Sequence, residues 1–310
     1  MSNRVFSFSQ FSKLFEGGAA IKTARRIRED EFPATMEHIK EVLFPILGIN
    51  PNKQGEEYII IGSIGKKKDP SDTSGDLDLG YDAPWFARTN GVGQKETSAK
   101  INELLSQELP EALGFEPEIN YLKGLNIVSV GWPIGGDEAN GIVQLDLIPL
   151  SSMEWAEFIY YSPDYKKSES KYKSAHRNWL LSAILSARKE VLDRDESGEV
   201  MDYDSPVLIL SDGLYWHKKS YKGTRIPRLK HSKKIEGSER FVTRDPQEFI
   251  NFALGPGYTV NDVKTFEDLF KIINDPKFDL YDKLPEIKER FLEYMERTGL
   301  EVPKEINTIA

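Results

Sequence analysis

Two aspartates one residue apart form the part of this sequence with the clearest chemical potential. Asp76 and Asp78 lie in residues 75–79, GDLDL, where acidic and leucine residues alternate. Because successive side chains of a strand point to opposite faces, this period of two predicts both carboxylates on one face. Two neighbouring anions repel each other, and a divalent cation between them relieves that repulsion. Oxygen-only ligands favour Mg²⁺ or Mn²⁺ over zinc.

A third aspartate lies inside an apolar segment far along the chain. Asp146 is the only charged residue of segment 141–150, GIVQLDLIPL. Burying a carboxylate without a partner is costly, so we expect Asp146 to share the metals of Asp76 and Asp78. The three aspartates are therefore the predicted metal ligands.

A strand that ends in Gly-Ser precedes the aspartate pair. Residues 58–61, YIII, form an apolar run that predicts a buried strand. Gly62 has no side chain and lets the backbone come close to a ligand, for which we expect a phosphate group. A Walker A loop is excluded, because Lys66 is followed by another lysine and not by Ser or Thr.

Together these motifs resemble the polymerase-β-type nucleotidyltransferase superfamily. The shared pattern is a strand ending in Gly62-Ser63, twelve further residues, the pair Asp76 and Asp78, and a later strand that contains Asp146. The amino-acid sequence of residues 61–80 also resembles that of uncharacterised nucleotidyltransferases of large bacteriophages. The resemblance is concentrated in residues 36–150.

The resemblance implies an enzyme that moves a nucleoside monophosphate from an NTP to an acceptor hydroxyl and releases pyrophosphate, with two Mg²⁺ or Mn²⁺ ions. It further implies that Asp76 and Asp78 bind both ions, and that Asp146 binds one and orients or deprotonates the acceptor. Nucleotide-binding residues are expected near the turn and in a later basic segment. They are Gly62, Ser63, Lys66, Lys171, Lys173 and Arg177.

The motifs leave the acceptor open. The first hypothesis is the 3′ end of an RNA such as tRNA, because residues 216–234 carry eight Lys or Arg, no acid, and aromatic residues on which bases can stack. The predicted nucleic-acid contacts are Lys218, Lys219, Tyr221, Arg225 and Arg228. The same segment could instead be solvated or dock on the acidic C-terminal helices. The alternatives are nucleotidylation (AMPylation) of a protein or small molecule, synthesis of an oligonucleotide second messenger, and a catalytically inactive nucleotide-binding or structural protein.

The helices and strands that must position these residues are expected to form an α+β fold with two domains. Residues 1–165 are expected to form a catalytic domain with a mixed β-sheet flanked by helices, and residues 166–310 a mostly helical domain with a small basic β-hairpin. Apolar periodicity and stop residues predict the individual elements. The helices are expected over 6–15, 35–47, 95–109, 171–192, 246–254, 265–273 and 284–298, and the strands over 58–61, 75–79, 125–132, 141–150, 207–210 and 214–221.

Composition narrows the function classes. A chain of 310 residues, 39% of them apolar, is long enough for two parts that each have a core. The absence of cysteine excludes disulfides, thiolate nucleophiles and cysteine-ligated zinc. No segment approaches the roughly 20 apolar residues of a membrane span, and the N-terminus does not read as a signal peptide. We therefore expect a cytoplasmic protein without a membrane partner, in the host cytoplasm if a phage encodes it.

Overall fold

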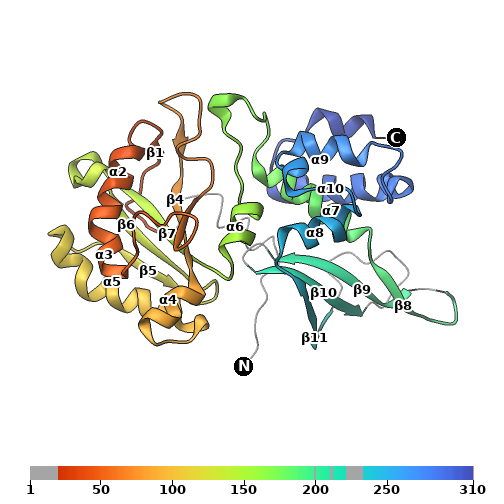
Figure 1. The fold of residues 1–310 in the computed structure, drawn as a ribbon, viewed down its shortest axis with the longest axis horizontal. Coiled ribbons are helices and arrows are strands. Elements are labelled where there is room, and N and C mark those ends of the chain that lie inside the picture. Colours follow the sequence, from red (N-terminus) through yellow and green to blue (C-terminus); the bar gives the residue numbers. More distant parts are fainter. Residues whose placement is uncertain (1–19, 199, 210–211, 221–232, 310) are drawn as a thin grey trace. The chain divides into compact units, whose positions relative to one another are not determined.

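The chain folds into two compact units. The structure is a computed structural model, which describes residues 20–198, 200–209, 212–220 and 233–309 (Figure 1). The units are Met1–Lys171 and Tyr172–Ala310, whereas the sequence predicted a boundary after residue 165. Both units contain helices and strands, so the fold is mixed α+β. The helix predicted over residues 6–15 lies outside the described residues.

A five-stranded mixed sheet forms the centre of the first unit. The strand order is β2 (Tyr58–Ile61), β4 (Asp76–Asp82), β7 (Ile142–Leu150), β6 (Ile127–Pro133) and β5 (Ile119–Leu122). Strands β4 and β7 run parallel, and the other neighbouring pairs are antiparallel. The four strands predicted in this region are present. Strand β5 was missed, because its four residues are all only half-buried and show no alternation of burial.

One face of this sheet carries the apolar core. Leu77 and Leu79 of β4, with Leu145 and Leu147 of β7, are 4% exposed or less. They belong to one cluster with residues of α2 (Phe32–His38), α3 (Phe44–Leu47) and α5 (Thr97–Leu113) (Figure 1). The remaining helices of this unit are α4 (Ala83–Asn90) and α6 (Met153–Ile159). The alternation in β4 therefore directs its aspartates away from the core, as predicted.

The two helices predicted before and after β4 are both present, with different ends. The first combines α2 and α3 through a π-helical turn, Ile39–Leu43, and stops at Gly48, where φ is 70°. The second, α5, continues past Pro110 to Leu113. A proline removes only one backbone hydrogen bond when it lies in the last turn, so it does not stop the helix there. No helix within the described ranges is long and apolar enough to cross a membrane.

The second unit contains a sheet that is larger than predicted. Four antiparallel strands follow the order β11 (Lys233–Thr243), β10 (Gly213–Ser220), β9 (Val200–Ile209) and β8 (Glu190–Arg194). The sequence predicted only the hairpin of β9 and β10, so the expectation of a mostly helical region with a small hairpin was wrong in extent. The three predicted C-terminal helices are confirmed as α8 (Pro246–Leu254), α9 (Phe266–Ile273) and α10 (Leu284–Thr298).

The helix predicted over 171–192 is shorter at both ends. Helix α7 spans Ser174–Ser186, and Lys173 is its N-cap residue with extended backbone. Residues 190–194 form β8 instead, in which Val191 pairs with Tyr203 of β9. Pairing with a strand distant in sequence overrides the helical spacing of the apolar residues, since strand formation depends on the neighbouring strand more than on local preference.

The packing around Gly80 in β4 yields a stability prediction. A Cβ at this position would lie 2.4 Å from Leu150 Cδ1 and 3.0 Å from Ile61 Cδ1. We expect Gly80→Ala to lower the free energy of unfolding by about 1 to 3 kcal/mol, the usual cost of an overpacked core. Urea denaturation measures it. The matched control is Gly93→Ala, whose Cβ would meet only the end of a flexible side chain; equal losses in the two variants would contradict the packing argument.

Candidate metal centre

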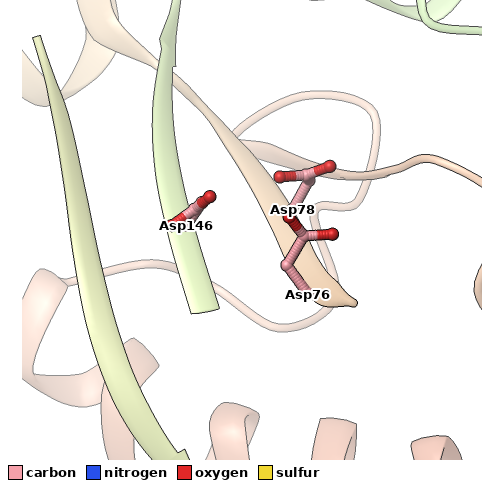
Figure 2. Close-up of side chains that lie close together, drawn as sticks. All are labelled: Asp76, Asp78 and Asp146. Carbon is pink, nitrogen blue, oxygen red and sulfur yellow. The ribbon is translucent and has the colours of Figure 1, made fainter. Parts of the chain in front are cut away.

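The register of β4 and β7 brings three aspartates together. Asp78 and Asp146 are direct partners in the parallel pair, and Asp76 is the partner of Gln144. Figure 2 shows the three aspartate side chains on neighbouring strands, close to one another. One carboxylate oxygen from each of Asp76, Asp78 and Asp146 lies within 4.8 Å of the other two. The arrangement gathers acidic groups that lie up to 70 residues apart in the sequence.

The surroundings of these carboxylates disfavour their charged forms. Burial, followed by the charge of Asp146, raises the pKa of Asp76 to about 7, although Arg26 and Lys67 oppose the rise. Burial and the charges of Asp76 and Asp146 raise the pKa of Asp78 well above its ordinary value. Without a cation, the cluster therefore holds protons at a pH where ordinary aspartates are fully ionised.

Gln144 holds Asp146 in place. Its Nε2 donates to both carboxylate oxygens of Asp146, at 3.0 Å each, and its Oε1 accepts the backbone N–H groups of Ala20 and Ile21. Asp146 is 4% exposed, and burial raises its pKa against the opposing effects of Ser129 and Gln144. Gln144 was not among the predicted site residues, although a second polar residue two positions before Asp146 in an apolar strand was a usable signal.

One carboxylate oxygen provides a test of whether a metal fits here. Asp76 Oδ2 is buried and has no hydrogen-bond partner within the described part of the chain. An unsatisfied buried acceptor is costly, and a bound cation supplies the missing interaction. Three carboxylates offer oxygen donors only, which suits Mg²⁺ or Mn²⁺. Asp76, Asp78 and Asp146 therefore fit a divalent-metal site.

The glycine turn after β2 adjoins the cluster. Gly62 has φ of 88°, a left-handed conformation that glycine adopts without strain, and a Cβ there would lie 3.9 Å from Asp78 Oδ2. Ser63 follows directly in the same turn. Lys66 Nζ donates to the Ser162 carbonyl at 3.0 Å, and burial lowers the pKa of Lys66 against two nearby carboxylates. The structure thus brings three predicted nucleotide-binding residues to one loop beside the aspartates.

A buried carboxylate, Glu29, shapes this loop. Glu29 is 5% exposed, its Oε2 accepts the Gly65 N–H at 2.9 Å, and its Oε1 accepts the Lys67 N–H at 3.0 Å. Lys166 Nζ lies 3.2 Å from the same carboxylate. Nothing in the charged segment around Glu29 distinguishes it in sequence from a solvated surface residue. The fold alone identifies its role.

The other predicted triphosphate ligands have different surroundings. Lys171 is the last residue of the first unit, and Lys173 is an exposed residue at the start of α7. Arg177 is 1% exposed, and its guanidinium donates to the Lys264 carbonyl at 3.4 Å within the second unit. Lys173 and Arg177, four residues apart, therefore do not share one accessible helix face.

The residues predicted to contact nucleic acid are described only in part. Lys218 lies in β10, and its ammonium is 3.5 Å from Asp202 Oδ2 with the side chain 42% exposed. Lys219 also lies in β10. Tyr221, Arg225 and Arg228 lie outside the described residues.

Comparison with known proteins returned no similar family, protein or fold. No family model, no curated protein and no solved structure matches this chain. The likeness to polymerase-β-type nucleotidyltransferases therefore stays a prediction from the motifs, and the function has to be argued from the site.

The raised pKa of Asp76 gives a pH prediction. Because its folded-state pKa of about 7 exceeds the ordinary value of 3.8, its stabilising contribution is complete below about pH 4 and is lost as the pH rises through 7. In EDTA, we expect the free energy of unfolding of the wild type to fall between pH 5 and 8. Asp76→Asn should reduce that fall by up to about 3 kcal/mol, because the pKa of Asp76 lies about two units above pH 5 and each pKa unit is worth about 1.4 kcal/mol.

Urea denaturation of wild type and variant at several pH values measures this effect. The matched control is Asp72→Asn, which neutralises an exposed carboxylate four residues away. Mg²⁺ at pH 8 should stabilise the wild type more than Asp76→Asn. If the free energy of unfolding had the same pH dependence in the wild type, Asp76→Asn and Asp72→Asn, the prediction would be wrong, because folding would not change the ionisation of Asp76.

Proposed function

We propose that this protein is a metal-dependent nucleotidyltransferase that moves a nucleoside monophosphate from an NTP to an acceptor hydroxyl and releases pyrophosphate. The observation that carries the proposal is the trio Asp76, Asp78 and Asp146, whose carboxylates lie within 4.8 Å on neighbouring parallel strands. The glycine turn at Gly62, directly beside Asp78, supports it. The same elements carry the resemblance to the polymerase-β-type superfamily.

The three aspartates would hold two divalent ions, with Asp76 and Asp78 contacting both. When bound, such ions neutralise charge on the attacked phosphate and on the entering and leaving oxygens. Asp146, held by Gln144, would orient the acceptor hydroxyl and accept its proton on a carboxylate oxygen.

The loop after β2 would receive the triphosphate. The Ser63 hydroxyl can donate to a phosphate oxygen, and Gly62 leaves room for that oxygen beside Asp78. Lys66 is half-buried at the same loop and supplies a positive charge. For the acceptor we propose the 3′ hydroxyl of an RNA, on the basis of the cations of segment 216–234.

Substitution of the aspartates tests the activity. We expect Asp78→Asn and Asp146→Asn to lower transfer by at least about a hundredfold, the lower end for loss of a general base, with the fold retained. The assay incubates each labelled NTP with Mg²⁺ and separate pools of RNA, protein and small-molecule acceptors. Asp72→Asn serves as the control and should transfer as the wild type does.

Transfer that survives in both aspartate variants, or in EDTA, would refute the proposed chemistry. Label that enters only protein or a small product would replace the RNA acceptor by nucleotidylation or by second-messenger synthesis. No binding of labelled NTP in the presence of Mg²⁺ would leave only a structural role.

Neutralising the basic segment tests the RNA acceptor. Replacing four cations by alanine should weaken RNA binding and flatten its salt dependence, by up to about 0.7 in log–log slope per lost phosphate contact with a single strand. The replaced residues are Lys218, Lys219, Arg225 and Arg228. The control neutralises four exposed cations elsewhere in the second unit: Lys271, Lys277, Arg297 and Lys304. Fluorescence anisotropy over a range of salt concentrations measures the RNA affinity of the two variants and its salt dependence. Equal losses of affinity in the two variants would exclude a specific RNA surface.

A further inference from the structure

The first unit contains a pocket beside the edge strand of its sheet. Its volume is about 510 Å³, within the range of small-molecule sites. Strand β2 forms one wall, and α6 with the two tyrosines that follow it forms the other. Its lining includes Gly55, Ile59, Lys66, Glu157, Tyr160 and Tyr161.

This pocket lies next to the aspartate cluster. Ile61 of β2 is the direct partner of Asp78, and Ile59 follows two residues back along the strand, a step of about 7 Å. Tyr160, which lines the pocket, lies close enough to Asp78 for that charge to add to the effect of burial in raising its pKa. Lys66 connects the pocket to the glycine turn. A ligand in the pocket would therefore have one end near the metal site.

The walls of the pocket suit a flat heterocycle. Ile59 and Tyr160 are 9% exposed or less and offer apolar surface, while Tyr161 is half-exposed and lies under the Lys66 ammonium, 5.8 Å from its ring centroid. Aromatic and aliphatic faces of this kind are where nucleobases stack. The pocket thus combines stacking surface with a small number of polar groups on its rim.

Glu157 gives the rim a hydrogen-bonding preference. It is exposed, and it makes no ion pair with any described residue. Its Oε1 lies against the pocket wall at Gly55, where a Cβ would be 3.0 Å away. An ionised carboxylate only accepts hydrogen bonds. Adenine, cytosine and guanine present an exocyclic amino group to it, whereas uracil flanks its single N–H with two carbonyl oxygens, which repel the carboxylate.

We propose that this pocket binds the nucleobase of a nucleotide substrate, and that Glu157 selects amino-bearing bases over uracil. The identity of the ligand as a substrate rests on the proposed nucleotidyltransferase function. The pocket itself needs neither a phosphate nor a metal to bind a base, so its test can be separated from the transfer assay.

Binding of the four free nucleosides to the full chain in EDTA provides that test. Adenosine, cytidine, guanosine and uridine are titrated separately and followed by ligand-observed NMR. We expect at least one amino-bearing nucleoside to bind, and uridine to bind at least about tenfold more weakly, a difference of about 1.4 kcal/mol. Binding without this preference, or no binding at all, would overturn the proposal while leaving the aspartate chemistry open to its own assay.

Two variants connect the preference to the pocket. Glu157→Gln has both donor and acceptor atoms, so it should bring uridine to within about threefold of the best nucleoside, a difference of about 0.7 kcal/mol. Tyr161→Ala should weaken the binding of every nucleoside, because it removes an aromatic face on which the base can stack. The matched control is Glu154→Gln, an exposed residue of the same helix that does not line the pocket. An unchanged preference in Glu157→Gln, or equal effects of the two glutamate variants, would overturn the assignment.

Discussion

The pairing of β4 with β7 holds three carboxylates close together although they repel one another, and the properties of the site follow from this constraint. Parallel pairing fixes Asp78 opposite Asp146, so their Cα atoms cannot move apart without breaking the hydrogen bonds between β4 and β7. The opposite face of the same strands is closed by buried leucines, each of which stabilises the fold by about 1.5 to 3 kcal/mol. The sheet is therefore held firmly enough to keep an unfavourable charge arrangement, and a divalent cation would turn that arrangement into a favourable one.

Alternation and apolar runs were enough to predict most of the first sheet. The period of two in β4 placed Asp76 and Asp78 on the face away from the core, and the apolar run of β7 marked Asp146 as a buried charge. The sequence did not predict the register of β4 against β7. Which aspartate lies opposite Asp146 depends on contacts between strands that are distant along the chain. A polar residue two positions before Asp146 is visible in the sequence, but the hydrogen-bond partners of Gln144 depend on that register and on the backbone of Ala20 and Ile21, so they could not be predicted.

The second unit was predicted less well for a physical reason. All five residues of β8 are exposed, so no pattern of burial marks them as a strand, and the apolar spacing up to Val191 imitates a helix. The helices α8 and α9 were predicted from apolar periodicity, and each also begins at an N-cap residue, Asp245 or Thr265, whose side chain accepts a backbone N–H group of the first turn. Local hydrogen-bonding signals are contained in the sequence, whereas an edge strand exists only through its neighbour.

The carboxylate of Glu29 would affect the entropy of the phosphate binding that is proposed for the loop after β2. By accepting the N–H groups of Gly65 and Lys67, it orders the loop during folding, before any ligand arrives. Fixing the backbone of one residue costs about 1 to 2 kcal/mol. If a few residues of the loop were flexible before binding, ordering them would therefore make phosphate binding several kcal/mol less favourable. A loop that is already ordered keeps that free energy available for discriminating between ligands.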